Sequence, residues 1–334
     1  MAEPTASGSR LAAIVYNPIK VDLARLRLAV AGAEQRHRWA DSLWLETTEE
    51  DPGGGQAAAA IGAGAEVVVA AGGDGTVRAV AEALRDGSAS LALMPAGTGN
   101  LLARNLGLTL DDIEDAIENA FAGEDAPIDV GVARLERRDG SRDEHAFMVM
   151  AGIGVDAQMA ANTNPELKKR FGWIAYVHSI SRSLLDRNRI VLRYELDDSD
   201  PTTTRVHSLL IGNCGTLPGN LLLLPEAEVN DGLFDIVALR PKGFLGWVQI
   251  WFKIAWENGV LRRSLAGRKL LSMTKPVRTL RYLRGRRITV RIDHRPTEFE
   301  LDGDPYGEVV AFRCTVDHDS LRIRVPEGHP LTAD

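Results

Sequence analysis

The chain has 334 residues, of which 45% are hydrophobic and 25% charged, so it is long enough for two soluble domains with sizeable cores. Its formal net charge of −7 argues against general nucleic-acid binding. Its apolar runs are far shorter than the roughly 18 residues of a membrane span, so no transmembrane helix is predicted. The first nine residues lack a signal-peptide pattern and resemble a disordered tail. Two cysteines without metal-ligand spacing predict free thiols in a reducing cytoplasm.

Strand and helix patterns alternate between residue 10 and residue 127. Strands are predicted at 11–18, 41–48, 66–73 and 89–97, and helices at 21–38, 53–65 and 76–87. Strand–helix alternation with short connections is typical of a parallel sheet that is covered by helices on both faces. The first domain is therefore predicted to be an α/β domain.

The pattern changes after residue 127, and most of the predicted elements of residues 128–321 are strands. A hairpin with its turn at Asp139–Gly140 is predicted within 128–154, a helix at 166–187, a second hairpin at 189–213, and further strands within 286–303 and 309–326. We expect a β-rich second domain, with residues 322–334 as a segment that could rejoin the first domain.

Two strands of the first half end in glycine-rich loops. The segment Gly72–Thr76 reads GGDGT, and the segment Pro95–Asn100 reads PAGTGN. Glycine allows backbone N–H groups to approach phosphate oxygens closely, and ligands of open parallel sheets bind at the carboxyl ends of the strands. Neither loop matches a P-loop or a dinucleotide fingerprint. Together they predict a cradle for a polyphosphate.

Asp74 is an acid inside this predicted anion site. A carboxylate beside phosphates is unfavourable unless it helps to hold Mg²⁺ or accepts a proton, and both roles belong to phosphoryl transfer. The simpler alternative is that Asp74 only caps the helix that follows it.

The ordered set of motifs resembles the diacylglycerol kinase catalytic domain family, which includes bacterial lipid kinases, sphingosine kinases and ceramide kinases. The first motifs are YNP, the Thr47–Thr48 pair, GGDGTVRAVAEAL and PAGTGNLLARNLGL. They are followed by IDVG, AGIGVDA, LKKRFGWIAYV, EVNDGLFDI and LDGD. GGDGT by itself also occurs in NAD kinases and phosphofructokinases, so the order of the whole set carries the resemblance.

The resemblance implies a nucleotide-binding α/β domain, a β-sandwich-like lipid domain and an active site between them. It implies that ATP and Mg²⁺ are the cofactors and that a lipid hydroxyl, by default that of diacylglycerol, is the acceptor in phospholipid biosynthesis. The implied nucleotide-binding residues are Asn17, Pro18, Thr47, Thr48, Gly72, Gly73, Asp74, Gly75, Thr76, Val77, Arg78, Gly97, Thr98, Gly99 and Asn100. Asp74 and Asp304 are the implied catalytic carboxylates, and Asp231 is the implied ligand of a structural Mg²⁺, with the carbonyls of Glu228 and Leu233. The segment Asn230–Gly232 also fits a plain hairpin turn.

Three positions depart from the family pattern. Asp304 stands where the family has Glu, Leu101 stands where many bacterial members have Asp, and NPIKVD lacks the second half of the family's NPxSG loop, although Lys20 could supply phosphate contacts there. These departures leave a catalytically inactive binding protein as one alternative. A sphingoid or ceramide kinase and an NAD kinase are others.

A basic segment suggests the partner surface. Between Lys253 and Arg295 there are thirteen Lys and Arg residues and only two acids, which fits either a surface that binds an anionic membrane or a simple solvated face. The aromatic segment 243–260 fits either an interfacial helix or a core helix. We expect a cytoplasmic protein that visits the inner face of the membrane, with a homodimer left open.

Overall fold

The computed structural model describes residues 10–154, 189–217, 221–240 and 280–332. The chain forms two compact units: the first comprises Met1–Ile128 and Asp319–Asp334, and the second comprises Asp129–His318. The predicted helix at 166–187 and the aromatic segment 243–260 lie outside the described residues, as does most of the basic segment.

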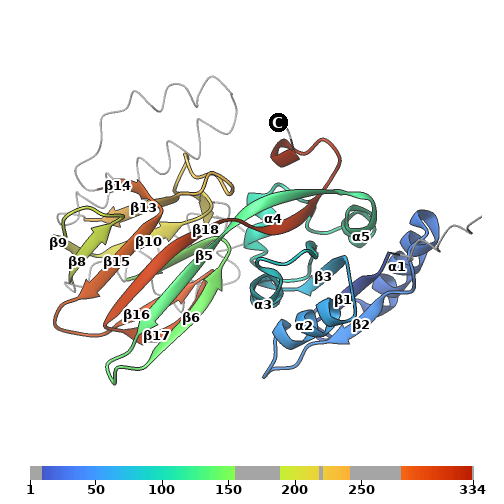
Figure 1. Cartoon of the computed structure of the whole chain (residues 1–334), viewed down its shortest axis with the longest axis horizontal. Coiled ribbons are helices and arrows are strands. Elements are labelled where there is room, and N and C mark those ends of the chain that lie inside the picture. Colours follow the sequence, from blue (N-terminus) through green and yellow to red (C-terminus); the bar gives the residue numbers. More distant parts are fainter. Residues whose placement is uncertain (1–9, 155–188, 218–220, 241–279, 333–334) are drawn as a thin grey trace, which may run out of the picture. The chain divides into compact units, whose positions relative to one another are not determined.

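The first unit is built on a parallel sheet (Figure 1). Its strands are β2 (Leu43–Glu46), β1 (Ala12–Tyr16), β3 (Val67–Gly72), β4 (Ser90–Pro95) and the last part of β18 (Ala311–Val325), in that order across the sheet. Each neighbouring pair is parallel, with Ile14 opposite Val69, and Leu91 opposite Ile323. Strands β1 and β3 are buried along their whole length, as their continuous apolar sequences require.

Helices cover this sheet and connect its strands. They are α1 (Leu23–His37), α2 (Gly54–Gly62), α3 (Asp74–Leu84), α4 (Leu101–Asn105) and α5 (Ile113–Ala122), with a short 3₁₀ turn at Pro330–Thr332. Helices α1 and α5 share one apolar core with β1, β3 and β4, and α2 packs against α3. Trp39 and Phe121 meet edge to face in that core, with ring centroids 5.0 Å apart. The α/β prediction is confirmed, and α5 is a helix that was not among the predicted elements.

The second unit contains two mainly antiparallel sheets. One holds β6 (Arg142–Phe147), β5 (Glu124–Glu136), β18, β15 (Arg287–Ile292), β8 (Ile190–Leu196) and β9 (Thr202–Val206). The other holds β14 (Leu280–Gly285), β13 (Phe234–Leu239), β10 (Ser208–Gly212), β7 (Met150–Ile153), β16 (Thr297–Leu301) and β17 (Asp304–Val309). A small pair, β11 (Thr216–Leu217) and β12 (Leu221–Leu222), lies apart from both.

The core of the second unit joins side chains of both sheets. Phe147 of the first sheet stacks on Phe234 of the second at 5.5 Å between ring centroids, and Phe312 of the first sheet meets Phe299 of the second at 4.7 Å. All four rings are buried in one apolar cluster. The unit is therefore a β-sandwich, as the resemblance implied.

The predicted hairpin at 189–213 is only partly right. Strands β8 and β9 pair as expected, with Ile190 opposite Val206. The chain then changes sheets at His207, whose backbone N–H donates to the carbonyl of Leu239, and β10 pairs with β7 and β13 instead. The run RVHSLL looked continuous because a change of sheet needs only one residue and leaves the strand pattern intact.

Both cysteines, Cys214 and Cys314, are buried free thiols, as predicted, and burial raises the pKa of each. Among the described residues, every helix is too short or too polar to cross a bilayer.

Candidate functional site in the first unit

The first glycine loop links β3 directly to α3. Gly73 caps α3 with an extended backbone, and its carbonyl accepts the N–H of Val77. A Cβ on Gly72 would lie 2.7 Å from the side chain of Thr76, which is itself buried in the first turn of α3. Gly72 is therefore glycine because the helix begins too close to the strand for a side chain to fit. Gly75, Val77 and the buried Arg78 occupy the same first turns.

The second glycine loop lies against the first. The N–H of Ala96 donates to the carbonyl of Gly72, and the N–H of Gly97 donates to Oδ1 of Asn100. A Cβ on Gly97 would lie only 2.8 Å from Cα of Gly73. The two loops thus touch backbone to backbone at the carboxyl edge of the sheet, while Thr98 at the tip of the second loop is exposed. This contact brings together the loops that the sequence predicted as one cradle.

Asp74 joins the two loops through its carboxylate. Oδ2 accepts the N–H of Asn100 at 3.0 Å, and Oδ1 accepts the N–H of Leu101 at 2.6 Å. Asp74 begins α3, but its side chain caps α4, whose own Ncap residue, Asn100, makes no side-chain cap. A Cβ on Gly99 would lie 2.3 Å from Oδ2 of Asp74, so the approach of the carboxylate requires glycine there. Asp74 thus caps a helix, but it is α4 in the other loop and not α3, the helix that follows it.

A fixed carboxylate of this kind fits the network of a hydrated metal ion. Each carboxylate oxygen has two lone pairs, and Oδ1 and Oδ2 of Asp74 each use one for a backbone N–H. The remaining lone pairs could accept hydrogen bonds from the water shell of Mg²⁺, which that ion usually keeps. Leu101 supplies no second carboxylate at this point, and it is buried.

A lysine lies beside the first loop. Asn17 follows β1, donates its N–H to the carbonyl of Ala71, and accepts the N–H groups of Ile19 and Lys20 with Oδ1. This turn, which contains Pro18, directs Lys20 so that its Nζ would lie 2.8 Å from a Cβ on Gly73. An ammonium group thus stands over the N-terminal end of α3, where a phosphate would be expected to bind.

A cavity of about 210 Å³ opens next to Lys20. It is lined by the turn before α1, by Pro95 and Ala96 at the end of β4, and by the segment before α5. The cavity contains both Arg25 and acidic side chains, and Arg25 is held by Glu114 through two hydrogen bonds. Through Pro95 and Ala96 the cavity adjoins the second glycine loop.

The threonine pair follows β2 at the same edge of the sheet. The N–H of Thr47 donates to the carbonyl of Tyr16, and the Thr47 side chain is buried. The hydroxyl of Thr48 accepts the N–H of Asp51, and the Asp51 carboxylate caps the start of α2 through the N–H groups of Gly53 and Gly55. Thr48 therefore organises a helix start, a structural role that sequence reasoning did not assign to it.

Residues of the predicted site in the second unit

The predicted metal ligand Asp231 has an arginine as its partner. Arg284 forms an ion pair with Oδ2 of Asp231, and Oδ1 of Asp231 accepts the N–H of Leu233. Arg284 also lies 3.4 Å from the carboxylate of Asp235. Burial raises the pKa of Asp235, and the nearby Asp231 raises it further while Arg284 opposes both. The donor set fits a cation, and the guanidinium of Arg284 supplies that charge here, so a metal ion would have to compete with it.

The LDGD motif forms a tight turn between β16 and β17. Asp302 and Gly303 both have positive φ, at 50° and 89°, as a two-residue turn of this type requires. The buried carboxylate of Asp302 accepts three backbone N–H groups, those of Met148, Val149 and Met150, at 2.8–2.9 Å. Asp304, the predicted catalytic residue, begins β17 and is half-buried. The two acids of the motif therefore differ: Asp302 fixes the backbone, and Asp304 is accessible.

Asp129 is a buried carboxylate that sequence reasoning did not single out. It is fully buried, accepts the N–H of Gly232 at 2.7 Å and contacts Nδ1 of His318 at 2.7 Å. It therefore positions the turn that carries Asp231. The IDVG motif contained the residue, but only the fold shows that its neighbours come from positions 232 and 318.

Relation to known proteins

Two glycine loops in backbone contact at the carboxyl edge of a parallel sheet, with a carboxylate fixed between them, define an α/β protein built for phosphoryl groups. Residues 13–133 match the family model for the diacylglycerol kinase catalytic domain. The chain is 31% identical to a Pseudomonas aeruginosa protein named "Probable lipid kinase YegS-like", over 92% of this chain and 91% of that one. A Pseudomonas putida protein of the same name is 32% identical over 80% of both chains. The chain belongs to the YegS-like lipid kinase family.

Solved structures support the fold. A diacylglycerol kinase from Bacillus anthracis aligns with 97% of this chain and 100% of its own, with a TM-score of 0.66 and 16% identity. Yeast NADH kinase aligns with 98% of this chain and 86% of its own, with a TM-score of 0.51 and 9% identity. At these identities the likeness concerns the fold alone.

Proposed function

We propose that this lipid kinase transfers the γ-phosphoryl group of ATP, with Mg²⁺, to the free hydroxyl of diacylglycerol and yields phosphatidic acid. The observation that carries the proposal is the carboxylate of Asp74, which is held by the N–H groups of Asn100 and Leu101 where two glycine loops meet. A carboxylate fixed in that position has little use in simple anion binding, because it would repel the phosphates. It suits a network that also holds a divalent cation.

The chain's own groups would bind the nucleotide and orient it. The backbone N–H groups at the start of α3 and the ammonium of Lys20 face the region where phosphate charge would gather. Mg²⁺, when bound, would neutralise further charge on the β- and γ-phosphates. Both oxygens of Asp74 are held, so the carboxylate would meet that charge in a fixed orientation and without a reorganisation step.

Asp304 is the proposed proton acceptor. As the hydroxyl oxygen of the lipid bonds to the γ-phosphorus, the bond between that phosphorus and the oxygen bridging the β- and γ-phosphates breaks, and ADP leaves. The proton of the lipid hydroxyl passes to the carboxylate of Asp304. Asp304 is half-buried at the start of β17, next to the rigid turn formed by Asp302 and Gly303, so its backbone is well fixed. Its side chain is one methylene shorter than the glutamate usual in the family, and Asp304→Glu is therefore expected to retain activity.

The test uses γ-labelled ATP, Mg²⁺ and mixed micelles of candidate lipid alcohols, with NAD in a parallel tube. The variants are Asp74→Asn and Asp304→Asn. Asp139→Asn is the matched control, because its carboxylate also accepts a backbone N–H in a turn, that of Ser141. Loss of a proton acceptor or of a positioned charge is expected to lower turnover by about 10²–10⁴-fold. Thermal melting of each variant shows whether the fold is intact.

Each outcome has a distinct meaning. Label in diacylglycerol that is lost in Asp74→Asn and Asp304→Asn but retained in Asp139→Asn supports the proposal. Near wild-type turnover in both test variants contradicts the assigned roles. Label only in the NAD tube indicates a nucleotide kinase. ATP binding without transfer to any acceptor indicates an inactive binding protein.

A further inference from the structure

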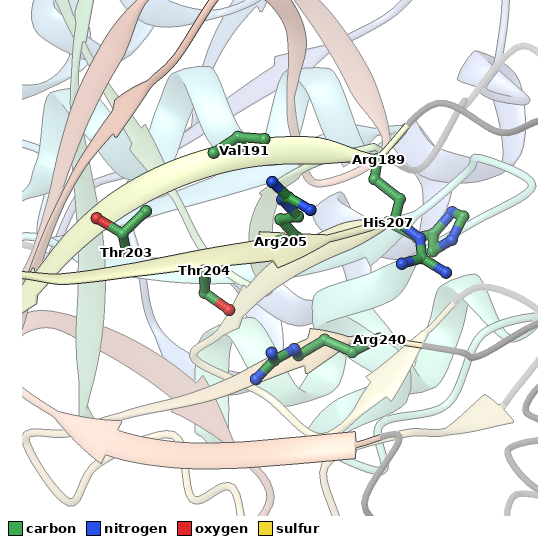
Figure 2. A pocket seen from close by; sticks show the side chains of 7 residues that line it. All are labelled: Arg189, Val191, Thr203, Thr204, Arg205, His207 and Arg240. Atoms are coloured by element: carbon green, nitrogen blue, oxygen red, sulfur yellow. The ribbon is translucent and has the colours of Figure 1, made fainter.

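The second unit contains a cationic cavity that the proposed reaction does not use. The cavity measures about 370 Å³, and its lining includes three arginines, Arg189, Arg205 and Arg240, together with His207 (Figure 2). These side chains come from three places in the fold: the residue before β8, strand β9 with the residue after it, and the residue after β13. Segments distant in sequence thus deliver like charges to one cavity.

The strand register explains why part of this set converges. Val191 of β8 lies opposite Arg205 of β9, and Ile190 lies opposite Val206. Arg189 and His207 are each one residue beyond that last pair, so alternation places them on the same face as Arg205. Burial lowers the pKa of His207, and the charge of Arg189 lowers it further. The imidazole is therefore biased toward its neutral form beside the arginines.

Several other arginines that the structure describes have a carboxylate partner. Arg25, Arg134 and Arg137, for example, each form an ion pair with a carboxylate. No ion pair between Arg189, Arg205 or Arg240 and an acid is found within the described ranges of the chain. All three arginines are exposed, and a bound anion would relieve the repulsion between their like charges.

Thr204 provides an independent sign of a ligand. Its side chain lines the same cavity and is only 9% exposed. Its hydroxyl oxygen is buried and makes no hydrogen bond within the part of the chain that the structure describes. Thr204 directly precedes Arg205 on β9, so its side chain points to the opposite face of the strand from that of Arg205. Figure 2 shows its hydroxyl on the side on which the guanidinium of Arg240 lies. A buried hydroxyl without a partner is unfavourable, so a ligand oxygen that accepts from it would be favoured.

We propose that this cavity binds the phosphate group of a phosphate ester. Planar guanidinium groups match phosphate oxygens in a two-point geometry that a lysine cannot offer. The cavity is larger than a bare ion needs and lies near the lower end of small-ligand pockets. It therefore has room for the organic part next to the phosphate. A soluble phosphate ester and a phospholipid headgroup share this chemistry, and neither requires the proposed kinase reaction.

The test measures binding by the full chain to three probes: inorganic phosphate, glycerol 3-phosphate, and phosphatidylcholine vesicles with or without phosphatidylglycerol. The variants are Arg205→Gln, Arg240→Gln and Thr204→Val, the last of which removes the hydroxyl at nearly constant volume. Arg193→Gln is the matched control, because Arg193 lies on β8, is exposed, and does not line the cavity. Thermal melting verifies that each variant is folded.

We expect saturable binding that weakens at least tenfold in either cavity arginine variant and several-fold in Thr204→Val, with Arg193→Gln close to wild type. Binding of glycerol 3-phosphate with this pattern would assign a soluble ester. Binding only to the anionic vesicles with this pattern would assign a lipid headgroup. Equal effects of Arg193→Gln and the cavity variants, or no saturable binding to any probe, would overturn the proposal.

Discussion

Substitution of the turn residue Asp302 tests whether its carboxylate stabilises the fold by holding the backbone of residues 148–150. Its buried carboxylate accepts three backbone N–H groups, two through Oδ1 and one through Oδ2. In Asp302→Asn the amide oxygen can take the position of Oδ1 and keep the bonds to Val149 and Met150, whereas the amide nitrogen then faces the N–H of Met148. One unsatisfied buried donor costs about 1–3 kcal/mol.

The alanine variant should lose considerably more. Asp302→Ala removes all three acceptors, and even at the lower figure of about 1 kcal/mol for each buried donor the loss is about 3 kcal/mol. Asp302 also has a φ of 50°, a left-handed conformation that costs alanine at least about 1 kcal/mol. The total for Asp302→Ala is therefore about 4 kcal/mol, clearly above the loss in Asp302→Asn.

Urea unfolding followed by hydrogen exchange measures both effects. The midpoint at constant m-value gives the change in unfolding free energy, and exchange of the amides at 148–150 shows whether the loss is local. Asp293→Asn is the control, because Asp293 is exposed and its substitution should stay within about 0.5 kcal/mol of wild type. Equal losses in the asparagine and alanine variants, or unchanged exchange at 148–150, would refute this account of the carboxylate.

The remaining predictions concern the loops, the thiols and acid stability. Gly97→Ala should separate the glycine loops and weaken ATP binding, because its Cβ meets backbone 2.8 Å away. In Gly73→Ala the new Cβ lies 2.8 Å from Nζ of Lys20 and 3.6 Å from Cα of Gly97, so only the lysine side chain has to move. This variant should bind ATP more tightly than Gly97→Ala, and equal affinities by calorimetry would contradict the contact. Both buried cysteines should react with a thiol reagent only after urea unfolding, so rapid labelling of the native protein would refute their burial. The Arg137 guanidinium, with His145, lowers the pKa of Asp143 in the folded protein. The ion pair therefore stabilises the fold fully above the pKa of an unfolded aspartate, about 3.9, and this stabilisation is lost as pH falls through the lower pKa of the folded state. Asp143→Asn should therefore flatten the acid limb of the urea midpoint against pH, and an unchanged limb would count against the ion pair.

The sequence by itself determined the α/β half and the location of its loops. Short apolar runs rich in β-branched residues, such as Val67–Ala71, predict strands that are buried on both faces, and GGDGT and PAGTGN mark where two of them end. The steric rules that require glycine act over a few neighbouring residues, so the glycine spacing indicates these loops without knowledge of the fold. The order of the motifs also indicated the family to which the chain belongs.

Only the tertiary structure decided what the acidic side chains do. Asp74 caps a helix that begins 27 residues further on, Asp231 is paired with Arg284, and Asp302 holds the backbone at 148–150. The cationic cavity likewise joins residues from 189 to 240. A carboxylate has the same local sequence signature whether it binds a metal, caps a helix or neutralises an arginine. Its role is set by the partners that the fold brings within hydrogen-bonding distance, and those partners are remote in the chain.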